Sequence, residues 1–396
     1  MTSAVKPEAT IDVSVVMPCL NEARSVGTCV EKARRALEAA GVRAEVVVAD
    51  NRSTDGSIEI ARQAGARVVH AEVKGYGHAL RKGIEDASGA FIIIGDADDS
   101  YDFNEIPRFI AKWREGYEVV MGNRFRGEIK PGAMRWHHRY IGNPLLSGLL
   151  NLLFRTGMGD AHCGMRGFTK DVFQRMDLRT TGMEFASEFA IKAARLGARR
   201  TEIPITLWPD QRGRPSHLRS FPDGWRHLRF MLMYAPNWLF LLPGGLLATL
   251  GVALVFWLLP GPGKLGGTTI DVHTMLFGMV FTLLGVQIVS IGLFAKVFSY
   301  AERFDRSGKS LERAFRRIKL EHGLLLGAGL ALVGLAGNAR IFWGWAQSGF
   351  RPLDQVRGVI FWSLWTFLGA QIFFSSFFLS MLGISRDTYI GDYERQ

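Results

Sequence analysis

The chain of 396 residues contains only three cysteines. Cys19, Cys29 and Cys163 form no Cys-x-x-Cys pair and no metal-ligand spacing, which suits a reduced compartment. An apolar signal segment is also absent at the start, because residues 1–10 are short of apolar side chains. We therefore expect the N-terminal domain to stay in the cytoplasm, where it is made.

Charged residues become scarce after about residue 237, where apolar runs near the ~20 residues of a spanning helix take over. This change in composition predicts a cytosolic domain over residues 1–222 and a transmembrane domain over residues 238–396. Residues 223–237 carry apolar side chains on one side and Arg226 and Arg229 on the other, as an amphipathic helix at a membrane surface does. Four spans are expected at about 238–259, 272–298, 323–345 and 358–382.

The loop between the second and third spans contains most of the basic residues of the membrane region. They are Arg303, Arg306, Lys309, Arg313, Arg316, Arg317 and Lys319. By the positive-inside rule, this loop, the N-terminal domain and the C-terminus are predicted to be cytoplasmic in an inner or plasma membrane. The net charge of +11 indicates an anionic partner, and phosphates of lipids or nucleotides suit a membrane protein better than nucleic acid does.

Short apolar strands alternate with helical segments through the N-terminal domain. The expected strands are 12–17, 44–49, 67–71, 91–94, 118–121 and 202–205. This alternation predicts a doubly wound α/β sheet. A dinucleotide-binding loop is excluded, because Gly75 and Gly77 are followed by Leu80 where a Gly-x-Gly-x-x-Gly fingerprint needs glycine.

Acidic residues follow two of these strands. Asp96 and Asp98 come directly after the apolar strand 91–94, and Asp50 ends the strand 44–49. Ligands of open α/β sheets bind beyond the carboxyl ends of the strands. Asp96 and Asp98 flank one small residue, so both carboxylates can bind one hard cation that accompanies a diphosphate.

Three ordered motifs resemble those of the family-2 glycosyltransferases. They are Pro18-x-x-Asn21-Glu22, Asp50-Asn51-x-Ser53-x-Asp55-Gly56 and Asp96-x-Asp98. Over residues 12–237 the chain is most similar to the synthases that attach a sugar to dolichol or polyprenyl phosphate. The resemblance implies a GT-A-type doubly wound mixed sheet, interfacial amphipathic helices and a C-terminal four-helix transmembrane domain.

The resemblance also implies an inverting transfer of a hexose from a nucleotide-sugar, UDP-glucose-like or GDP-mannose-like, to polyprenyl phosphate. Asp96 and Asp98 would hold Mg²⁺ or Mn²⁺, and with Asp160 they would be the catalytic residues. The donor would contact Pro18, Asn21, Glu22, Asp50, Asn51, Ser53, Asp55, Lys74, Asp96, Arg214 and Ser216. Ser100 stands where many relatives have a glutamine ligand, which leaves the third ligand open among Asp99, Asp102 and water.

Two clusters of basic residues, 122–126 and 135–139, follow the strand 91–94 and its aspartates. The guanidinium group of arginine can donate two parallel hydrogen bonds to a phosphate. The resemblance implies that Arg124 and Arg139 bind the phosphate of the lipid acceptor in this way. Residues 140–156 are apolar but interrupted by glycine and proline, which favours a helix lying in the membrane interface. Asp160 would orient the acceptor phosphate or the sugar, whereas His162 is expected to be structural.

Two other functions remain open from the residues alone. A processive polysaccharide synthase would carry a Gln-x-x-Arg-Trp motif, but the chain has Gln211-Arg-Gly-Arg214-Pro. A non-catalytic lipid-sugar transporter would place ionisable residues inside the spans, and none is obvious there. The sequence leaves the assembly into a homo-oligomer open.

Overall fold

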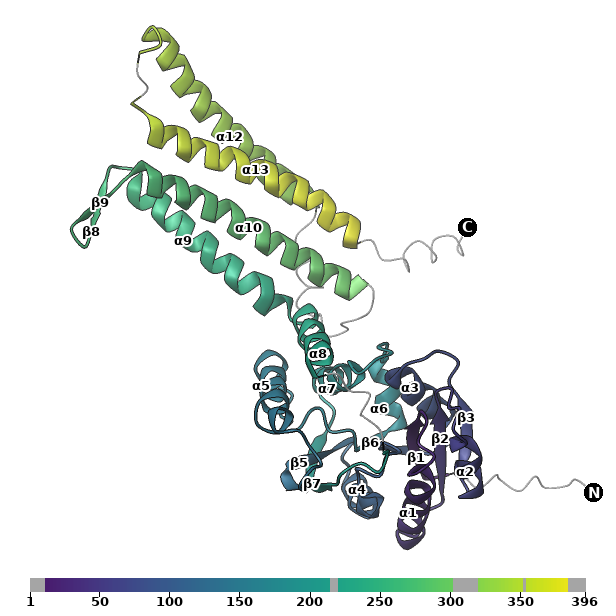
Figure 1. Ribbon diagram of the computed structural model, residues 1–396. Helices are drawn as coiled ribbons and strands as arrows, with labels where there is room; N and C mark the ends of the chain where they lie inside the picture. Colours follow the sequence, from purple (N-terminus) through teal and green to yellow (C-terminus); the bar gives the residue numbers. More distant parts are fainter. Residues whose placement is uncertain (1–10, 214–219, 302–319, 352–353, 384–396) are drawn as a thin grey trace, which may run out of the picture. The chain divides into compact units, whose positions relative to one another are not determined.

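The computed structural model describes residues 11–213, 220–301, 320–351 and 354–383 (Figure 1). The chain divides into two compact units, Met1–Met231 and Leu232–Gln396. The first unit contains a seven-stranded sheet, and the second contains four long apolar helices.

The sheet of the first unit is mixed. Its strands are β1 (Val13–Cys19), β2 (Ala44–Asp50), β3 (Arg67–His70), β4 (Phe91–Ile94), β5 (Val119–Ile129), β6 (Arg166–Thr169) and β7 (Arg200–Leu207). They lie in the order β3-β2-β1-β4-β6-β5-β7, with β6 antiparallel to both β4 and β5. The remaining pairs are parallel, which confirms the predicted mixed α/β architecture.

Two strands differ from the sequence prediction. β6 lies within a segment that we expected to be a loop, because four residues that begin with Arg166 and include Gly167 give no apolar alternation. β5 continues to Ile129, although strand character was expected to end at residue 121. Arg124 therefore lies on a strand, next to a register shift between β5 and β7.

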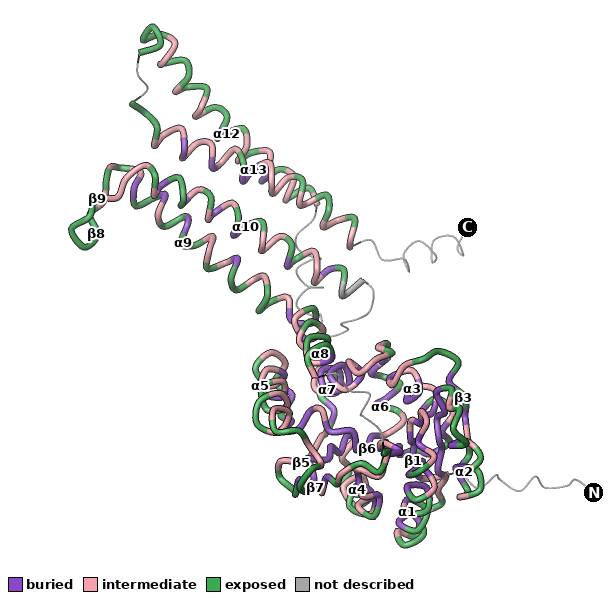
Figure 2. The backbone as a smooth tube through the Cα atoms, in the orientation of Figure 1, coloured by how far each residue is buried: buried purple, intermediate pink, exposed green. Residues whose placement is uncertain are grey.

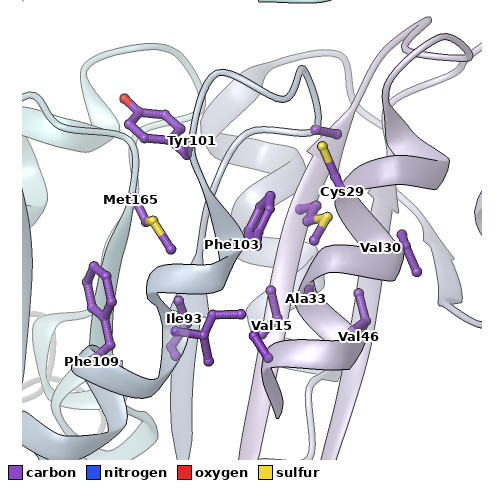
Figure 3. Close-up of a cluster of buried hydrophobic side chains, with 14 of the residues drawn as sticks. Val15, Cys29, Val30, Ala33, Val46, Ile93, Tyr101, Phe103, Phe109 and Met165 are labelled. Atoms are coloured by element: carbon purple, nitrogen blue, oxygen red, sulfur yellow. The ribbon is translucent and has the colours of Figure 1, made fainter. Parts of the chain in front are cut away.

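Helices cover both faces of the sheet, and alternate residues of each strand point to opposite faces. α1 (Val26–Ala39) and α4 (Ile106–Arg114) pack on one face with Phe91 and Ile93 of β4, in the core that Figure 3 shows in part. Phe91 stacks on Trp113 of α4 with ring centroids 5.0 Å apart.

The opposite face is covered by α3 (Tyr76–Asp86), α6 (Lys170–Met176) and α7 (Phe185–Arg195). The ring of Phe168 on β6 contacts Phe173 of α6 and Phe189 of α7. α2 (Ser57–Gln63) lies between β2 and β3 in the chain. The sheet is thus doubly wound, and its central strands are buried on both faces (Figure 2).

Two further helices of the first unit expose large apolar side chains. α5 (Asn143–Phe154), which follows a turn of π-helix over His138–Gly142, exposes Leu145 and Leu152. α8 (Ser220–Tyr234) exposes Phe221 and Trp225.

The second unit contains four helices that are long and apolar enough to cross a membrane, as predicted. These spans are Asn237–Leu258, Val272–Phe298, Leu320–Gln347 and Val356–Leu382. They belong to α9 (Leu242–Leu258) with the π-helical turn before it, α10 (Val272–Ala301), α12 (Leu320–Gln347) and α13 (Val356–Gly383). A small hairpin, β8 (Gly263–Leu265) and β9 (Thr268–Ile270), connects α9 to α10. The basic loop that predicts the orientation lies outside the described residues.

Candidate active site

A cavity of about 750 Å³ opens at the carboxyl end of β4 in the first unit. Its lining includes the carboxylates Asp96 and Asp98 and the basic residues Arg124, Arg135 and Arg212. Pro18, Glu22, Asn51 and Lys74 of the predicted donor set also line it. The topology therefore brings together residues from stretches that are far apart in the sequence.

Asp96 and Asp98 are held by different partners. Asp96 Oδ1 accepts a hydrogen bond of 3.0 Å from the hydroxyl of Tyr76. Asp98 Oδ1 accepts from the backbone N–H of Ser100 at 3.0 Å and from its hydroxyl at 2.6 Å. Asp98 Oδ2 forms an ion pair with Arg212, which was not among the predicted site residues.

The electrostatics of this pair fit a divalent cation. Burial raises the pKa of Asp96 to about 6, and the nearby charge of Asp98 acts in the same direction. Two neighbouring carboxylates provide the hard oxygen donors that Mg²⁺ and Mn²⁺ prefer. In the described part of the chain, no cluster of three or more His, Cys, Asp or Glu side chains has the geometry of an all-protein metal site. The cavity therefore suits an ion that shares its ligands with a bound diphosphate.

The neighbouring acidic residues point elsewhere. Asp99, with a φ of 61°, forms an ion pair of 2.7 Å with Lys32 of α1. Asp102 accepts from the backbone N–H of Asn104 and caps the short helix Phe103–Glu105. Ser100, at the position of the glutamine in relatives, is hydrogen-bonded to Asp98. Water or substrate oxygens are therefore the better candidates for the remaining ligands.

The first two motifs are joined to each other by hydrogen bonds. Asn21 Oδ1 accepts from the backbone N–H of Thr54 at 2.7 Å, and the backbone N–H of Asn21 donates to Ser53 Oγ at 2.9 Å. Asp55 Oδ2 accepts from the backbone N–H of Ala23 at 3.0 Å. These side chains shape the two loops after β1 and β2, and the cavity wall itself is formed by Pro18, Glu22 and Asn51.

Asp50 is the last residue of β2, and it is buried. Its carboxylate accepts from the backbone N–H groups of Arg52 and Ser53, at 3.1 and 3.0 Å, and lies 3.4 Å from His70 Nδ1. Asn51 Oδ1 accepts from the backbone N–H of Gly75 at 2.8 Å, which positions the loop that contains Lys74. Arg214 and Ser216, the other predicted donor contacts, lie outside the described residues.

Arg124 and Asp160 form a buried bidentate pair. Arg124 Nε and Nη2 donate to the two carboxylate oxygens of Asp160 at 2.7 and 2.8 Å, and the backbone N–H of Arg124 donates at 3.1 Å. Both oxygens of Asp160 are thus engaged, and the pair fixes the orientation of the guanidinium. Nη1 of Arg124 has no protein partner in the part of the chain that the structure describes.

The second predicted arginine lies beside the cavity rather than among its lining residues. Arg139 stacks on the ring of Tyr140, with Cζ 5.4 Å from the ring centroid. Its backbone N–H donates to the carbonyl of Arg135, so the two arginines lie one helical turn apart. Arg135 and His138, which the sequence analysis did not single out, line the cavity. Arg135 lies four residues before Arg139, and His138 lies one residue before it. This closeness in sequence is the signal that could have found them.

Histidines connect the cavity wall to α8. His162 Nε2 lies 3.1 Å from Ser187 Oγ, which lies 2.8 Å from Nδ1 of His227 on α8. Burial, and then the charge of His227, lower the pKa of His162 well below its usual value, so its ring is neutral. His162 lines the cavity and packs against His227, and the structural role expected for it stays a prediction.

Comparison with known proteins assigns the chain to a class. Residues 14–177 match the model of glycosyl transferase family 2, and residues 293–383 match the family 2 C-terminal transmembrane region. The low-salt glycan biosynthesis hexosyltransferase Agl6 of Haloferax volcanii is 41% identical over 371 residues, which cover 93% of this chain and 89% of that protein. The chain belongs to glycosyltransferase family 2, and it is an integral membrane enzyme.

Two more distant similarities accompany this match. The dolichyl-phosphate hexose transferase of Haloferax volcanii is 31% identical over 197 residues, covering 49% of this chain and 82% of that protein. Glucosyl-3-phosphoglycerate synthase of Mycobacterium tuberculosis, solved with Mn²⁺, UDP-glucose and phosphoglyceric acid, is 20% identical. That similarity covers 56% of this chain and 79% of the synthase, with a TM-score of 0.44.

Proposed function

We propose that the enzyme transfers a hexose from a nucleotide-sugar to polyprenyl phosphate at the cytoplasmic face of the membrane, with inversion at the anomeric carbon. One observation supports this most directly: a single cavity is lined by a carboxylate pair and by a group of arginines. A nucleotide-sugar brings a diphosphate with its cation, and a lipid phosphate brings a second anion. The name of the dolichyl-phosphate hexose transferase, a relative at 31% identity, agrees with such an acceptor.

In this proposal, the donor lies along the loops after β1, β2 and β4. Pro18, Glu22 and Asn51 line that part of the cavity, and Lys74 adds a positive charge. Asp96 and Asp98 would hold Mg²⁺ or Mn²⁺, which supplies charge stabilisation to the departing diphosphate. Asp50, Asn21, Ser53 and Asp55 support the loops that contact the nucleotide.

The acceptor phosphate would bind Arg124, with Arg135 beside it and Arg139 one turn further along. Asp160 holds two nitrogens of Arg124 and leaves Nη1 for the phosphate. A phosphate monoester has a second pKa near 6, so the nucleophile is already an oxyanion at neutral pH and requires no general base. The protein's main contribution is to hold it in line with the anomeric carbon.

The reaction balances without a further reactant. A phosphate oxygen forms a bond to the anomeric carbon, while the bond from that carbon to the diphosphate oxygen breaks. The nucleoside diphosphate leaves with the electron pair, and the product is a polyprenyl phosphate sugar. The four membrane-spanning helices suit an enzyme whose acceptor remains in the bilayer.

The test separates donor binding from acceptor binding on one purified protein. Donor affinity is measured by titrating nucleotide-sugars in the presence of Mn²⁺, and acceptor affinity by titrating a short polyprenyl phosphate. We expect Asp98→Asn to weaken donor binding and Arg124→Lys to weaken acceptor binding. Arg35→Lys, at an exposed position of α1, is the control for both. If Arg124→Lys weakens only the donor, the arginines bind the diphosphate and the acceptor site is wrong.

A further inference from the structure

Tyr76 is the one side chain, among the described residues, that donates a hydrogen bond to the carboxylate of Asp96. The bond engages Oδ1 at 3.0 Å, and it leaves Oδ2 to a ligand. A phenol hydroxyl is protonated at neutral pH, so Tyr76 donates in this bond and the carboxylate of Asp96 accepts.

The backbone on either side of Tyr76 is held against a second segment of the chain. A Cβ atom on Gly77 would lie 2.8 Å from the carbonyl oxygen of Thr180 and 2.9 Å from that of Gly182. Gly75 has a φ of 153°, and a Cβ there would overlap the carbonyl of Thr181. The backbone N–H of His78 donates to the same carbonyl at 3.1 Å. This close approach of the two segments fixes the backbone position from which the side chain of Tyr76 extends.

That second segment is itself fixed by a buried glutamate. Glu188 of α7 is fully buried, and its carboxylate accepts from the backbone N–H of Thr180 at 2.8 Å and from Thr180 Oγ1 at 2.7 Å. Lys192, one helical turn later, neutralises Glu188 through an ion pair of 2.7 Å. A continuous set of contacts thus runs from α7 through Thr180 and the turn at Gly75–Gly77 to Tyr76 and Asp96.

We propose that Tyr76 is a positioning residue that holds Asp96 in the orientation required to bind the divalent cation, with Glu188 supporting it through Thr180. The inference rests on the proposed metal role of Asp96 and Asp98. Partners that orient a ligating carboxylate typically account for 10- to 100-fold in metal affinity. Tyr76 also lines the cavity, but its hydroxyl is engaged by Asp96, so its effect should appear in metal binding first.

The test measures Mn²⁺ binding by the full-length protein from the loss of the free-ion signal in electron paramagnetic resonance. With a nucleoside diphosphate present and no acceptor, Tyr76→Phe should raise the Kd for Mn²⁺ about 10- to 100-fold. At saturating Mn²⁺, its kcat should return close to the wild-type value. Tyr117→Phe is the matched control. The ring of Tyr117 contacts Lys112 and Arg199, and Tyr117 is not among the residues that line the cavity.

Further variants keep the outcome decisive. Thr180→Val leaves Tyr76 intact but removes one bond to Glu188, and it should weaken Mn²⁺ binding in the same direction by a smaller factor. If Asp98→Asn leaves Mn²⁺ binding unchanged, the metal role itself is wrong. If Asp98→Asn abolishes binding while Tyr76→Phe and Thr180→Val bind as the wild type does, only the role of Tyr76 is wrong.

A separate observation concerns the membrane unit, where one sequence pattern occurs twice. Thr282-Leu-Leu-Gly-Val-Gln-Ile288 on α10 matches Thr366-Phe-Leu-Gly-Ala-Gln-Ile372 on α13 at Thr, Leu, Gly, Gln and Ile. Gly244-x-x-x-Ala248-x-x-Gly251 on α9 likewise matches Gly327-x-x-x-Ala331-x-x-Gly334 on α12. The hairpins α9–α10 and α12–α13 therefore share these residues at corresponding positions and in the same order.

Equivalent residues of the two hairpins make equivalent contacts. A Cβ atom on Gly285 would overlap the backbone of Ala248, and a Cβ atom on Gly369 would overlap the backbone of Ala331. In the same way, Gly251 lies against the backbone N–H of Thr282, and Gly334 lies against that of Thr366. Small residues at such places allow helices in a membrane to approach closely. The repeated sequence is thus also a repeated packing arrangement.

The equivalent glutamines of the two hairpins meet each other. Gln371 Nε2 donates to Gln287 Oε1 at 2.6 Å, within two of the four spans. A contact between equivalent residues is compatible with an approximate two-fold axis that passes between the hairpins near these glutamines. We infer that α9–α10 and α12–α13 are two copies of one helix hairpin, paired through this contact between their amides.

An exchange of the repeated segments and a double-mutant cycle test this inference. Placing the α13 residues at the matching sites of α10 (L283F and V286A) should leave the melting temperature close to that of wild type, as for conservative apolar exchanges. The transferase rate should stay within about 2-fold of wild type. Gln287→Leu and Gln371→Leu should each lower the melting temperature, because each leaves one amide unpaired, and the double variant should lose no more than either single one. Gln347→Leu, at the exposed end of α12, is the control.

Two results would overturn the inference. One is additive losses in the double variant, which would mean that the glutamines act independently. The other is unfolding of the exchange variant, which would mean that the two segments are not equivalent.

Discussion

Asp98 is the residue whose replacement should lower the transfer rate most directly. Asp98→Asn removes one of the two carboxylates that would hold the divalent cation against the departing diphosphate, and the loss of one electrostatic contact of this kind typically lowers the rate by about 100-fold or more. The transfer rate at saturating substrates and metal measures this. Asp102→Asn is a matched control, because Asp102 caps a short helix in the same acidic stretch. Asparagine caps a helix about as well as aspartate does, so this change should leave both stability and rate close to wild type. Near-normal turnover in Asp98→Asn would reject the metal role.

Arg124 gives a prediction about the acceptor. Arg124→Lys keeps the charge but loses the fork that pairs with Asp160, so acceptor affinity should fall by about 10-fold or more. Asp160→Asn should act in the same direction, because it frees the guanidinium that Asp160 holds. Isothermal titration with a short polyprenyl phosphate measures both. Equal acceptor affinity in all three proteins would place the lipid phosphate elsewhere.

Asp96 predicts a pH dependence of metal binding. Its pKa, raised to about 6 by burial and by Asp98, means that a proton competes with the metal below about pH 6. Affinity for Mn²⁺ should therefore fall as the pH drops through 6, and it should level off above that value. The measurement is made without acceptor, because the lipid phosphate titrates in the same range. Constant affinity from about pH 5 to pH 7.5 would contradict the raised pKa.

At the scale of elements, the contact between the start of α3 and the segment around Thr180 gives a stability prediction. A methyl group on Gly77 would press on two backbone carbonyls, so Gly77→Ala should cost about 1–3 kcal/mol, as overpacking does. Gly148→Ala on α5 is the matched control. No atom lies within 4 Å of its Cβ position, and a helical alanine should be neutral or stabilising by about 0.5–1 kcal/mol. Denaturant unfolding of both variants would show the difference, and equal effects would contradict the packing.

Elements with a strong pattern were predictable from the sequence. The apolar run Phe91–Ile94 and the Asp-x-Asp after it correctly located the strand end at the cavity. β6 was not predictable, because its four residues include a buried arginine and a glycine, and only pairing with β4 and β5 stabilises it as a strand. The register shift that places Arg124 on β5 also depends on β7, which is distant in the sequence.

The residues of the candidate site were likewise only partly predictable from the sequence. Asp96, Asp98, Arg124 and the first two motifs could be singled out because their residue types and spacing match a chemistry. Tyr76 and Arg212 could not, since their roles arise from contacts with Asp96 and Asp98 that only the fold creates. The repeat in the membrane helices was visible as a sequence pattern, although its meaning depends on the contact between Gln287 and Gln371.

At the scale of the whole molecule, the proposal requires the N-terminal unit to face the cytoplasm, where nucleotide-sugars are found. The three native cysteines are buried, so a single introduced cysteine can report its own exposure. Lys264→Cys, in the hairpin between α9 and α10, should react with a membrane-impermeant thiol reagent in intact cells, whereas Arg316→Cys should react only after the cells are opened. The reverse pattern would overturn the orientation.

The most direct test of the central claim follows a labelled hexose into its product. The purified enzyme is given radiolabelled UDP-glucose or GDP-mannose, Mn²⁺ and a short polyprenyl phosphate, and the organic phase is analysed by mass spectrometry. We expect one hexose joined to the phosphate of each lipid, with the anomeric configuration opposite to that of the donor. Asp98→Asn should form this product about 100-fold or more slowly. Label found in a polymer, or a lipid fraction without label for every donor tried, would contradict it.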